Sequence, residues 1–275
     1  MSRSGEARGE GAFRDHYTEL YGARWLGLEE ALRGSADSLP FRAAPALDPY
    51  YLDSASIYAA QSLELPKPGS GDDGAAQPRL VLDACAAPGG KSIVLATRLA
   101  TERDSAVRLI ANELSAARRR RLAYALDRHL PPELRTRVDL MGRDAASLCR
   151  SRPEAFDAIL LDAPCSSERH VLADPSALEE WTPARSRNLA VRQWALLSSA
   201  FLMLRPGGCL VYSTCSLEPR ENQLVVSRLE EKYAGSFRFD PPDDGRGEAA
   251  GPGVLILPDR AQGAGPMFVC RIRKL

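Results

Sequence analysis

From residue 79 onward, short apolar runs alternate with amphipathic segments that are long enough to be helices. The apolar runs predict strands at Leu80 to Cys85, Arg108 to Asn112, Val138 to Met141, Phe156 to Asp162 and Cys209 to Ser213. The other segments predict helices at Gly90 to Thr101, Ser115 to His129, Pro175 to Leu204 and Pro219 to Tyr233. This alternation is typical of a parallel sheet covered on both faces. We therefore predict a doubly wound α/β fold with a mostly parallel, Rossmann-like sheet.

The two ends of the chain depart from this alternation. Phe13 to Ala60 carries several tyrosines and a helical spacing of leucines, which predicts a small helical segment. Lys67 to Pro78 is rich in Gly, Pro and Asp, as flexible connections are. Val254 to Leu257 and Met267 to Ile272 are too close together for a crossover helix, so we expect an antiparallel C-terminal hairpin. The predicted organisation is a helical N-terminal segment at 1–64, a flexible connection at 65–78 and the main α/β domain at 79–275.

Composition and charge narrow the class of protein. Of the 275 residues 44% are apolar and 26% are charged, which is ordinary for a globular protein. Thirty-six basic and thirty-six acidic residues give no net charge, so any binding site for a polyanion must be local. The longest apolar runs are far shorter than the roughly 20 residues that span a bilayer, which argues against a membrane protein. The N-terminus resembles neither a secretory signal nor a transit peptide. We expect a cytoplasmic protein, with a mitochondrial location as the alternative if the chain is a processed form.

The cysteines and histidines do not predict a metal site. The six cysteines contain no C-x-x-C pair, and the three histidines do not stand at metal-ligand spacings. A chain of this size can bury its own core and carries no mark of export, so a disulfide framework is not expected either. We therefore expect free thiols and no bound metal.

The loop after the first predicted strand, from Asp83 to Ser92, reads Asp-Ala-Cys-Ala-Ala-Pro-Gly-Gly-Lys-Ser. Ligands of open α/β sheets bind at the carboxyl ends of the strands. Small residues let a ligand lie against the backbone there, and the next helix turns its free N–H groups toward it. The loop matches neither G-x-G-x-x-G nor G-x-x-x-x-G-K-[ST]. Such a turn can be purely structural, but Lys91, one of four lysines beside thirty-two arginines, favours a functional loop.

Acidic residues follow the next two predicted strands. Glu113 stands about 20 residues beyond the glycine turn, where a carboxylate can accept hydrogen bonds from both hydroxyls of a ribose. The alternative is a carboxylate that only favours the start of a helix. Asp144 follows the third strand, where it is placed to accept from the exocyclic amine of adenine. Together with the glycine turn, these residues predict a site for an adenosine-containing cofactor.

Two cysteines stand at the ends of the fourth and fifth predicted strands. A free cysteine is usually a small buried hydrophobic residue, which is our interpretation of Cys149, Cys209 and Cys270. At a strand end, close to a helix N-terminus, a thiolate is stabilised and can become a nucleophile. We therefore expect Cys165 and Cys215 to project from adjacent strands at the catalytic edge of the sheet.

A nucleophilic cysteine beside a site for S-adenosylmethionine points to methylation of carbon 5 of a pyrimidine. That carbon is not nucleophilic by itself, but a thiolate that adds to carbon 6 turns the ring into an enamine that can attack a methyl group. Asp162, at the end of the fourth strand, is placed to hydrogen-bond the ring nitrogen that gains electron density. The base must be unstacked or flipped to reach such a site.

These loops together resemble the Sun-domain (Nop/Fmu-type) family of S-adenosylmethionine-dependent RNA cytosine-5 methyltransferases. The shared motifs are Asp-x-Cys-Ala-Ala-Pro-Gly-Gly-Lys, Asp-x-Pro-Cys-Ser and Tyr-Ser-Thr-Cys-Ser, and the likeness runs from about Tyr17 to the C-terminus. The resemblance implies that Cys215 is the nucleophile and that Cys165 assists release of the product, with Asp162 and Lys91 as further catalytic residues. DNA cytosine-5 enzymes attack with the Pro-Cys cysteine, so the added Thr-Cys motif points to RNA.

The resemblance also implies S-adenosyl-L-methionine as the cofactor. The cofactor-binding positions that it carries over are Cys85, Ala86, Ala87, Pro88, Gly89, Gly90, Lys91, Glu113, Arg118, Asp144 and Asp162. Relatives often have aspartate in place of Glu113, and glutamate keeps the acceptor that a ribose needs.

Two details resemble the branch of this family that includes the mitochondrial ribosomal-RNA enzyme. They are the segment from Phe13 to Trp25 and the pair Arg169-His170, since bacterial ribosomal members usually have glycine near position 169. We therefore predict ribosomal RNA as the substrate, with transfer RNA as the alternative. With no appended RNA-binding domain evident, recognition is expected to rely on the N-terminal segment, an accessory RNA-binding protein or the ribosomal particle. A methyltransferase of proteins or small molecules and a non-catalytic ribosome-assembly factor remain as other classes.

The most basic run of the chain is Arg118 to Arg121, within a stretch of eleven arginines and seven acids at 101–150. Successive helical residues point about 100° apart, so these four side chains cannot all face one phosphate track. A solvated helix face is one interpretation, and a local RNA patch is the other, since arginine both pairs with phosphate and stacks on bases. We expect Trp181 and Trp194 to pack helices rather than to stack on bases.

Overall fold

The computed structural model describes residues 7–66, 79–101, 107–242 and 245–275. Most of the connection predicted at 65–78 therefore lies outside the described residues. The strands of the main sheet are β3 (Arg79–Asp83), β4 (Val107–Asn112), β5 (Val138–Met141), β6 (Phe156–Asp162), β7 (Leu204–Thr214), β8 (Phe237–Phe239), β9 (Glu248–Ala250), β10 (Gly253–Ile256) and β11 (Met267–Lys274). They follow the order β5-β4-β3-β6-β7-β11-β10-β9, and β8 pairs with β11.

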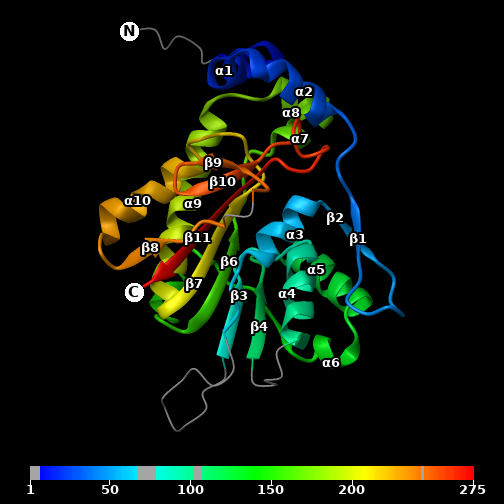
Figure 1. The fold of residues 1–275 in the computed structure, drawn as a ribbon, viewed down its shortest axis with the longest axis vertical. Coiled ribbons are helices and arrows are strands. Elements are labelled where there is room, and N and C mark those ends of the chain that lie inside the picture. The colour runs from blue at the N-terminus through cyan, green and yellow to red at the C-terminus, as the bar shows by residue number, and fades with distance from the viewer. Residues whose placement is uncertain (1–6, 67–78, 102–106, 243–244) are drawn as a thin grey trace.

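Strands β3 to β7 pair in parallel, whereas β8 to β11 pair antiparallel. The parallel half confirms the predicted doubly wound sheet, and the β10–β11 pair confirms the predicted C-terminal hairpin. Because β11 pairs with β7, the hairpin continues the same sheet beyond β7 and does not form a second layer (Figure 1).

Helices cover both faces of the sheet (Figure 1). Those of the main body are α3 (Ser54–Gln61), α4 (Gly90–Thr101), α5 (Ala116–His129), α6 (Pro132–Arg135), α7 (Glu168–Ala173), α8 (Pro175–Glu179), α9 (Ala184–Met203) and α10 (Gln223–Tyr233), with a 3-10 turn η2 (Leu148–Arg150). Successive side chains of a strand point to opposite faces. On β6, Ile159 joins the core beneath α9 and α10, and Leu160 joins the core beneath α3, α4 and α5.

Three predicted elements differ from the structure by more than two residues, each for a local reason. The helix expected at 175–204 is two helices, because Pro183 lacks the N–H that a helix interior needs and stands instead at the start of α9. The helix expected from Pro219 begins at Gln223, since Asn222 has non-helical backbone angles. Strand β7 begins at Leu204, five residues earlier than expected, and a bulge opposite β6 accommodates the turn-like sequence before Cys209.

The N-terminal segment packs into the core of the main domain. Its first helices are α1 (Gly9–Tyr21), the 3-10 turn η1 (Gly22–Arg24) and α2 (Trp25–Arg33). Phe13, Tyr17 and Trp25 are buried, and the ring centroids of Phe13 and Trp181 lie 5.2 Å apart. The prediction that Trp181 packs helices is therefore confirmed, and Trp194 likewise packs against the core. The domain division itself stays a prediction, but the two parts share one hydrophobic cluster.

The predicted helical N-terminal segment is confirmed, and a strand pair that the sequence did not predict interrupts it between α2 and α3. There β1 (Leu39–Phe41) and β2 (Tyr50–Leu52) pair as a short antiparallel hairpin. Each strand has three residues, and Pro40 sits in one of them, so neither shows the alternation that predicts a strand. Among the described helices, none combines the length and the apolar character needed to cross a membrane.

The shared core predicts that α1 contributes to the stability of the whole domain. We expect Phe13→Ala to lower the free energy of unfolding by about 3–5 kcal/mol, because the fully buried ring leaves a cavity. The matched control is Leu26→Ala on α2, where the side chain is 75% exposed and the change should stay within about 0.5 kcal/mol. Urea denaturation measures both, and equal losses in the two variants would contradict the shared core.

Candidate active site

The loop between β3 and α4 needs its two glycines. The Asp83 carboxylate, at the end of β3, accepts a hydrogen bond of 2.6 Å from the Ser92 hydroxyl, which ties the strand to the first turn of α4. Gly89 has a φ of +126°, a backbone conformation that other residues rarely adopt. A Cβ at Gly90 would come within 2.9 Å of a Tyr50 ring carbon. The loop therefore approaches β2 as closely as its backbone allows.

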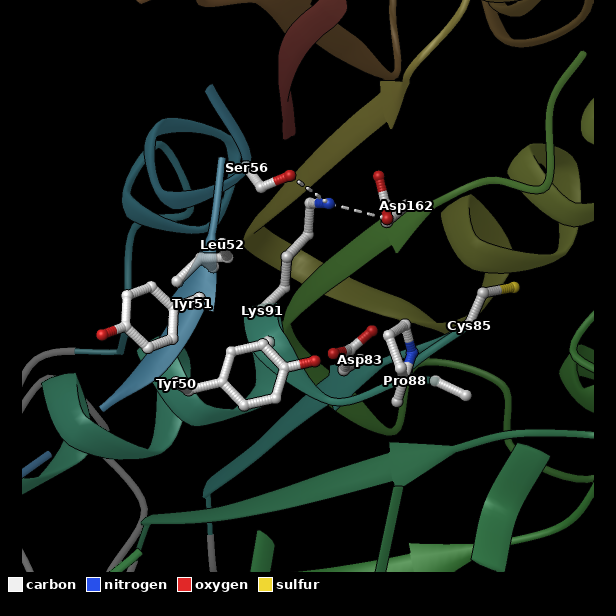
Figure 2. Close-up of a pocket in the computed structure, with 12 residues that line it drawn as sticks. Tyr50, Tyr51, Leu52, Ser56, Asp83, Cys85, Pro88, Lys91 and Asp162 are labelled. Atoms are coloured by element: carbon white, nitrogen blue, oxygen red, sulfur yellow. Dashed lines mark hydrogen bonds and ion pairs between the residues drawn. The ribbon is translucent and has the colours of Figure 1, made fainter. Parts of the chain in front are cut away.

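This loop forms one wall of a cavity of about 200 Å³, which we call the first cavity (Figure 2). Its lining residues come from both parts of the chain: Tyr50, Tyr51, Leu52, Ser56, Asp83, Cys85, Ala86, Ala87, Pro88, Gly90, Lys91 and Asp162. Sequence reasoning missed Tyr50 and Ser56 as site residues. They are more than 25 positions from the loop, and only the packing of β2 and α3 against α4 brings them there.

Lys91 and Asp162 form a buried ion pair in the first cavity. The ammonium donates to a carboxylate oxygen of Asp162 at 2.9 Å and to the Ser56 hydroxyl at 3.2 Å, and the side chain points between them in Figure 2. Burial by itself lowers the pKa of Lys91, but the charge of Asp162, the hydrogen bond to it and the nearby Cys215 and Asp83 together outweigh burial, and the pKa is raised. The other Asp162 oxygen accepts from the Ser213 hydroxyl at 2.8 Å. The Lys91 side chain is therefore not a solvent-exposed surface group.

A second cavity, of about 270 Å³, lies on the other side of Cys85. Its lining residues come from the carboxyl ends of β3 to β6, from the start of α5 and from α9: Ala84, Cys85, Asn112, Glu113, Leu114, Ser115, Arg118, Arg143, Asp144, Ala145, Pro164, Arg192 and Leu196. The structure thus brings Glu113, Asp144, Arg118 and Cys85 together. Asn112, which sequence reasoning missed, braces this cavity, because its amide donates to the Ala84 carbonyl at 3.0 Å.

Glu113 is buried and lines the second cavity, and its role as an acceptor for a ribose stays a prediction. One carboxylate oxygen accepts from the Ser115 backbone N–H at 2.8 Å, as expected of a carboxylate at a helix start. The other lies 3.5 Å from the Arg118 guanidinium, which also donates to the Ala87 carbonyl at 2.9 Å. Arg118 therefore connects the acidic strand end with the glycine-rich loop.

Asp144 is engaged by a partner that the sequence did not suggest. Arg192, on α9, donates to its carboxylate at 2.5 Å, and this hydrogen bond lowers the pKa of Asp144. Both side chains are partly exposed at the edge of the second cavity. Arg192 stands 48 positions from Asp144 in the chain, so only the packing of α9 shows the contact.

The thiols of Cys165 and Cys215 lie next to each other, as predicted for adjacent strand ends. Cys165 and Cys215 follow the adjacent strands β6 and β7, and their sulfur atoms lie 3.0 Å apart. Both are free thiols. Of the cysteines expected in the core, Cys209 and Cys270 are buried and Cys149 is half-buried against it.

The electrostatics of the two thiols are opposite. The pKa of Cys215 is lowered, first by the hydrogen bond from Cys165, and further by the Ser167 side chain and the charge of Lys91. The pKa of Cys165 is raised by the same hydrogen bond and by burial. The arrangement therefore favours a thiolate at Cys215 with a protonated Cys165 beside it, and a thiolate is the nucleophilic form of cysteine.

Behind the thiols lies a buried carboxylate, Glu168, at the start of α7. One of its oxygens accepts from the hydroxyls of Ser166 and Ser216 at 2.9 and 3.0 Å, and these serines directly follow the two cysteines. The same oxygen accepts from Tyr17 on α1 at 2.6 Å. The other accepts from the Leu217 backbone N–H at 2.8 Å. Glu168 thus joins both cysteine loops to the N-terminal helix, which the sequence did not indicate.

Glu221 is a second buried carboxylate in this network. One oxygen accepts from the Ser166 backbone N–H at 3.0 Å and from the Gln193 amide at 2.8 Å. The other is buried and has no hydrogen-bond partner among the described residues. Burial, followed by the charge of Glu168, raises the pKa of Glu221 to about 7.

Comparison with known proteins identifies the family. A family model described as 16S rRNA methyltransferase RsmB/F matches residues 75–273, so the chain belongs to this methyltransferase family, and the predicted Sun-type resemblance is confirmed. Ribosomal RNA small subunit methyltransferase F of Erwinia tasmaniensis is 38% identical over 208 residues, covering 74% of this chain and 42% of the relative. The protein of that name from Escherichia coli is 40% identical over 207 residues, covering 74% and 41%. The chain spans about two fifths of the length of these relatives.

Two solved structures have the same fold. The crystal structure of NSun6 from Pyrococcus horikoshii with SFG superimposes with a TM-score of 0.67 at 27% identity, covering 86% of this chain and 56% of that one. A methyltransferase homolog protein from Pyrococcus horikoshii has a TM-score of 0.71 at 24% identity, covering 96% and 94%. The assignment to the mitochondrial-type branch stays a prediction. Arg169, on which it rests, donates to the carbonyls of Leu32 and Gly263 and so holds α2 against the loop before β11.

The buried Glu221 carboxyl predicts a pH dependence of stability. Folded Glu221 keeps its proton up to about pH 7, whereas an unfolded glutamate loses it near pH 4.3. Between these values the folded state holds more protons, so this group makes the free energy of unfolding fall as pH rises. In Glu221→Gln we expect the fall between pH 5 and 7 to be shallower, by up to about 1.4 kcal/mol per pH unit.

Urea denaturation at several pH values between 5 and 7 measures this difference in slope. Glu230→Gln, at an exposed position on α10, is the matched control and should keep the wild-type slope. Identical slopes in wild type and Glu221→Gln would show that the buried carboxyl does not hold a proton in this range.

Proposed function

We propose that the protein is an S-adenosylmethionine-dependent RNA cytosine-5 methyltransferase that acts on ribosomal RNA. The observation that carries this proposal is the pair of thiols, Cys215 and Cys165, 3.0 Å apart with opposite pKa shifts. Membership of the 16S rRNA methyltransferase RsmB/F family supports both the reaction and the substrate class.

The two cavities fit the two ends of S-adenosylmethionine. The second cavity combines apolar residues with two carboxylates, so Glu113 would hold the ribose and Asp144 the adenine amine. Asp83 has a buried oxygen without a hydrogen-bond partner in the described part of the chain, and it lines the first cavity, where it would accept from the ammonium of the methionine end. Cys85 lines both cavities and would lie at the middle of the cofactor. When bound, the cofactor supplies an electrophilic methyl group.

Cys215 performs the nucleophilic step. Its thiolate sulfur forms a bond to carbon 6 of the cytosine, and the electron pair of the C5–C6 double bond moves to carbon 5. Carbon 5 is then nucleophilic enough to take a methyl group. The hydrogen bond from Cys165 and the charge of Lys91 favour the thiolate before the attack.

Asp162 and Lys91 act on the ring nitrogen that gains electron density during the addition. Lys91 donates to one oxygen of Asp162 and Ser213 donates to the other, so the carboxylate is held in one orientation. The ammonium of Lys91 keeps its proton, and its positive charge beside Asp162 offsets the electron density that the ring gains, which stabilises the adduct.

Cys165 assists release of the product. After methylation, water takes the proton from carbon 5, the electron pair of that C–H bond restores the C5–C6 double bond, and the Cys215 sulfur leaves carbon 6 as a thiolate. Cys165 lies next to the leaving sulfur, with its backbone loop anchored through Ser166 to Glu168 and Glu221. An accessory protein or the ribosomal particle would complete substrate recognition.

The proposed roles of the two thiols, attack by Cys215 and product release by Cys165, predict different defects when each is replaced by alanine. Cys215→Ala should abolish methyl transfer while the affinity for S-adenosylmethionine stays within about twofold, because this thiol does not hold the cofactor. Cys165→Ala should still attack but release slowly, so a covalent protein–RNA adduct accumulates. Methyl transfer from labelled cofactor and denaturing gel electrophoresis measure the two effects.

Cys149→Ala is the matched control, since this half-buried thiol packs against the core beneath α9 and not beside Cys165 and Cys215. It should retain activity and form no adduct beyond the wild-type level. Adduct formation by Cys215→Ala, or its absence in Cys165→Ala, would contradict the two-cysteine scheme.

The substrate is tested by bisulfite sequencing of total RNA from cells with and without the gene. A ribosomal RNA cytosine should lose methylation and regain it with wild type but not with Cys215→Ala. Loss confined to transfer RNA would contradict the ribosomal substrate. An unchanged RNA methylation pattern would contradict the proposed reaction on RNA.

A further inference from the structure

The run of arginines from Arg118 to Arg121 divides into two pairs in the structure. Arg118 and Arg119 turn back to the protein, where Arg118 donates to the Ala87 carbonyl and Arg119 to the Glu113 carbonyl at 2.8 Å. Arg120 and Arg121 are exposed, and neither side chain has a hydrogen bond or ion pair with another described residue. Two positive charges are thus left for a partner outside the chain.

These two arginines line an open hollow of about 560 Å³ on the outer surface of α5. The other lining residues are Tyr50, Pro88, Ala117, Tyr124 and Ala125. Tyr124 is 64% exposed, unusual for so large a ring. Its hydroxyl accepts from Arg128 at 3.1 Å, and Arg128 also binds Asp48 at 3.0 Å. The ring is therefore fixed at its polar end while much of its surface faces solvent.

The hollow adjoins the first cavity. Tyr50 and Pro88 line both, and Lys91 and Asp162 lie at the far wall of that cavity. The ring of Tyr50 is held by an edge contact with His129, at 5.2 Å between centroids. A bound polymer with one of its residues in the active site can therefore place a neighbouring residue in the hollow.

Aromatic rings beside unpaired arginines are suited to one class of partner. Bases stack on tyrosine, and guanidinium groups pair with phosphates, which is how single-stranded nucleic acids are bound without sequence preference. A chain with no net charge needs such a local site to hold a polyanion. A protein partner fits less well, because the hollow offers two unpaired positive charges and small apolar walls.

We propose that this hollow binds the single-stranded RNA that flanks the target cytosine, with a base on Tyr124 and phosphates on Arg120 and Arg121. The inference rests on the proposed function and names a surface for its substrate. It also assigns part of substrate recognition to the methyltransferase domain itself, in addition to the N-terminal segment.

The arginines are tested by the salt dependence of RNA binding. For Arg120→Ala/Arg121→Ala we expect about tenfold weaker binding of a short single-stranded oligoribonucleotide. The slope of log affinity against log salt should become shallower by about 1.4, since each phosphate contact to a single strand contributes about 0.7. The matched control is Arg152→Ala/Arg238→Ala, which removes the same charge from exposed positions preceding β6 and on β8. It should keep the wild-type slope.

Tyr124 is tested by kinetics with ribosomal RNA as the methyl acceptor. Tyr124→Ala should raise the KM for RNA about tenfold through lost stacking, with kcat and the affinity for S-adenosylmethionine unchanged. Tyr124→Phe keeps the ring and should keep the wild-type KM. An equal KM rise in both variants would overturn stacking as the role of the ring.

The outcomes separate the two proposals. If wild type methylates RNA and the Arg120/Arg121 variant matches its control in KM and salt slope, the hollow does not bind RNA, and the proposed function stands. If wild type transfers no methyl group to any RNA, the proposed function fails, and the inference about the hollow fails with it.

Discussion

The parallel pairing of β6 with β7 decides where chemistry can occur in this protein. Asp162 stands opposite Ser213 in the register, and the Ala163 backbone N–H donates to the Ser213 carbonyl at 2.8 Å. Strand β6 ends three residues before Cys165 and β7 ends directly before Cys215, so this one register places both sulfur atoms side by side. A strand pair slipped by one residue would turn one thiol toward the core and leave the other alone. The thiols of Cys215 and Cys165 and the carboxylate of Asp162 therefore all depend on the same ladder of hydrogen bonds.

Burying so many ionisable groups at one edge of the sheet is costly unless each is paired or protonated. The structure meets this cost in three ways. Lys91 neutralises Asp162, Glu168 accepts hydrogen bonds from several neighbours, and burial raises the pKa of Asp83 to about 7. Burial by itself raises the pKa of Cys215, but the hydrogen bond from Cys165, together with the Ser167 side chain and the charge of Lys91, outweighs it and the pKa is lowered. The same charges and hydrogen bonds therefore compensate the buried groups and lower the pKa of Cys215.

The N-terminal segment belongs to the site both chemically and structurally. Tyr17 on α1 holds Glu168, and through it both cysteine loops, while Tyr21 donates to the Leu217 carbonyl at 2.7 Å. The hairpin of β1 and β2 brings Tyr50 to the first cavity, and α3 brings Ser56 to Lys91. The segment thus braces the two cysteine loops and forms part of the wall of the first cavity.

The sequence alone determined the doubly wound sheet, the antiparallel C-terminal hairpin and the strand-end loops that carry the chemistry. Local periodicity and short motifs indicate these features, and the carboxyl ends of parallel strands lie at one edge of the sheet. Tertiary structure decided what comes from distant positions. The pairing of Asp144 with Arg192, the buried carboxylates behind the thiols and the contribution of Tyr50 all join residues far apart in the chain. It also divided Arg118 to Arg121 into an inner and an outer pair, since only the neighbours of a helix show which side chains find a partner.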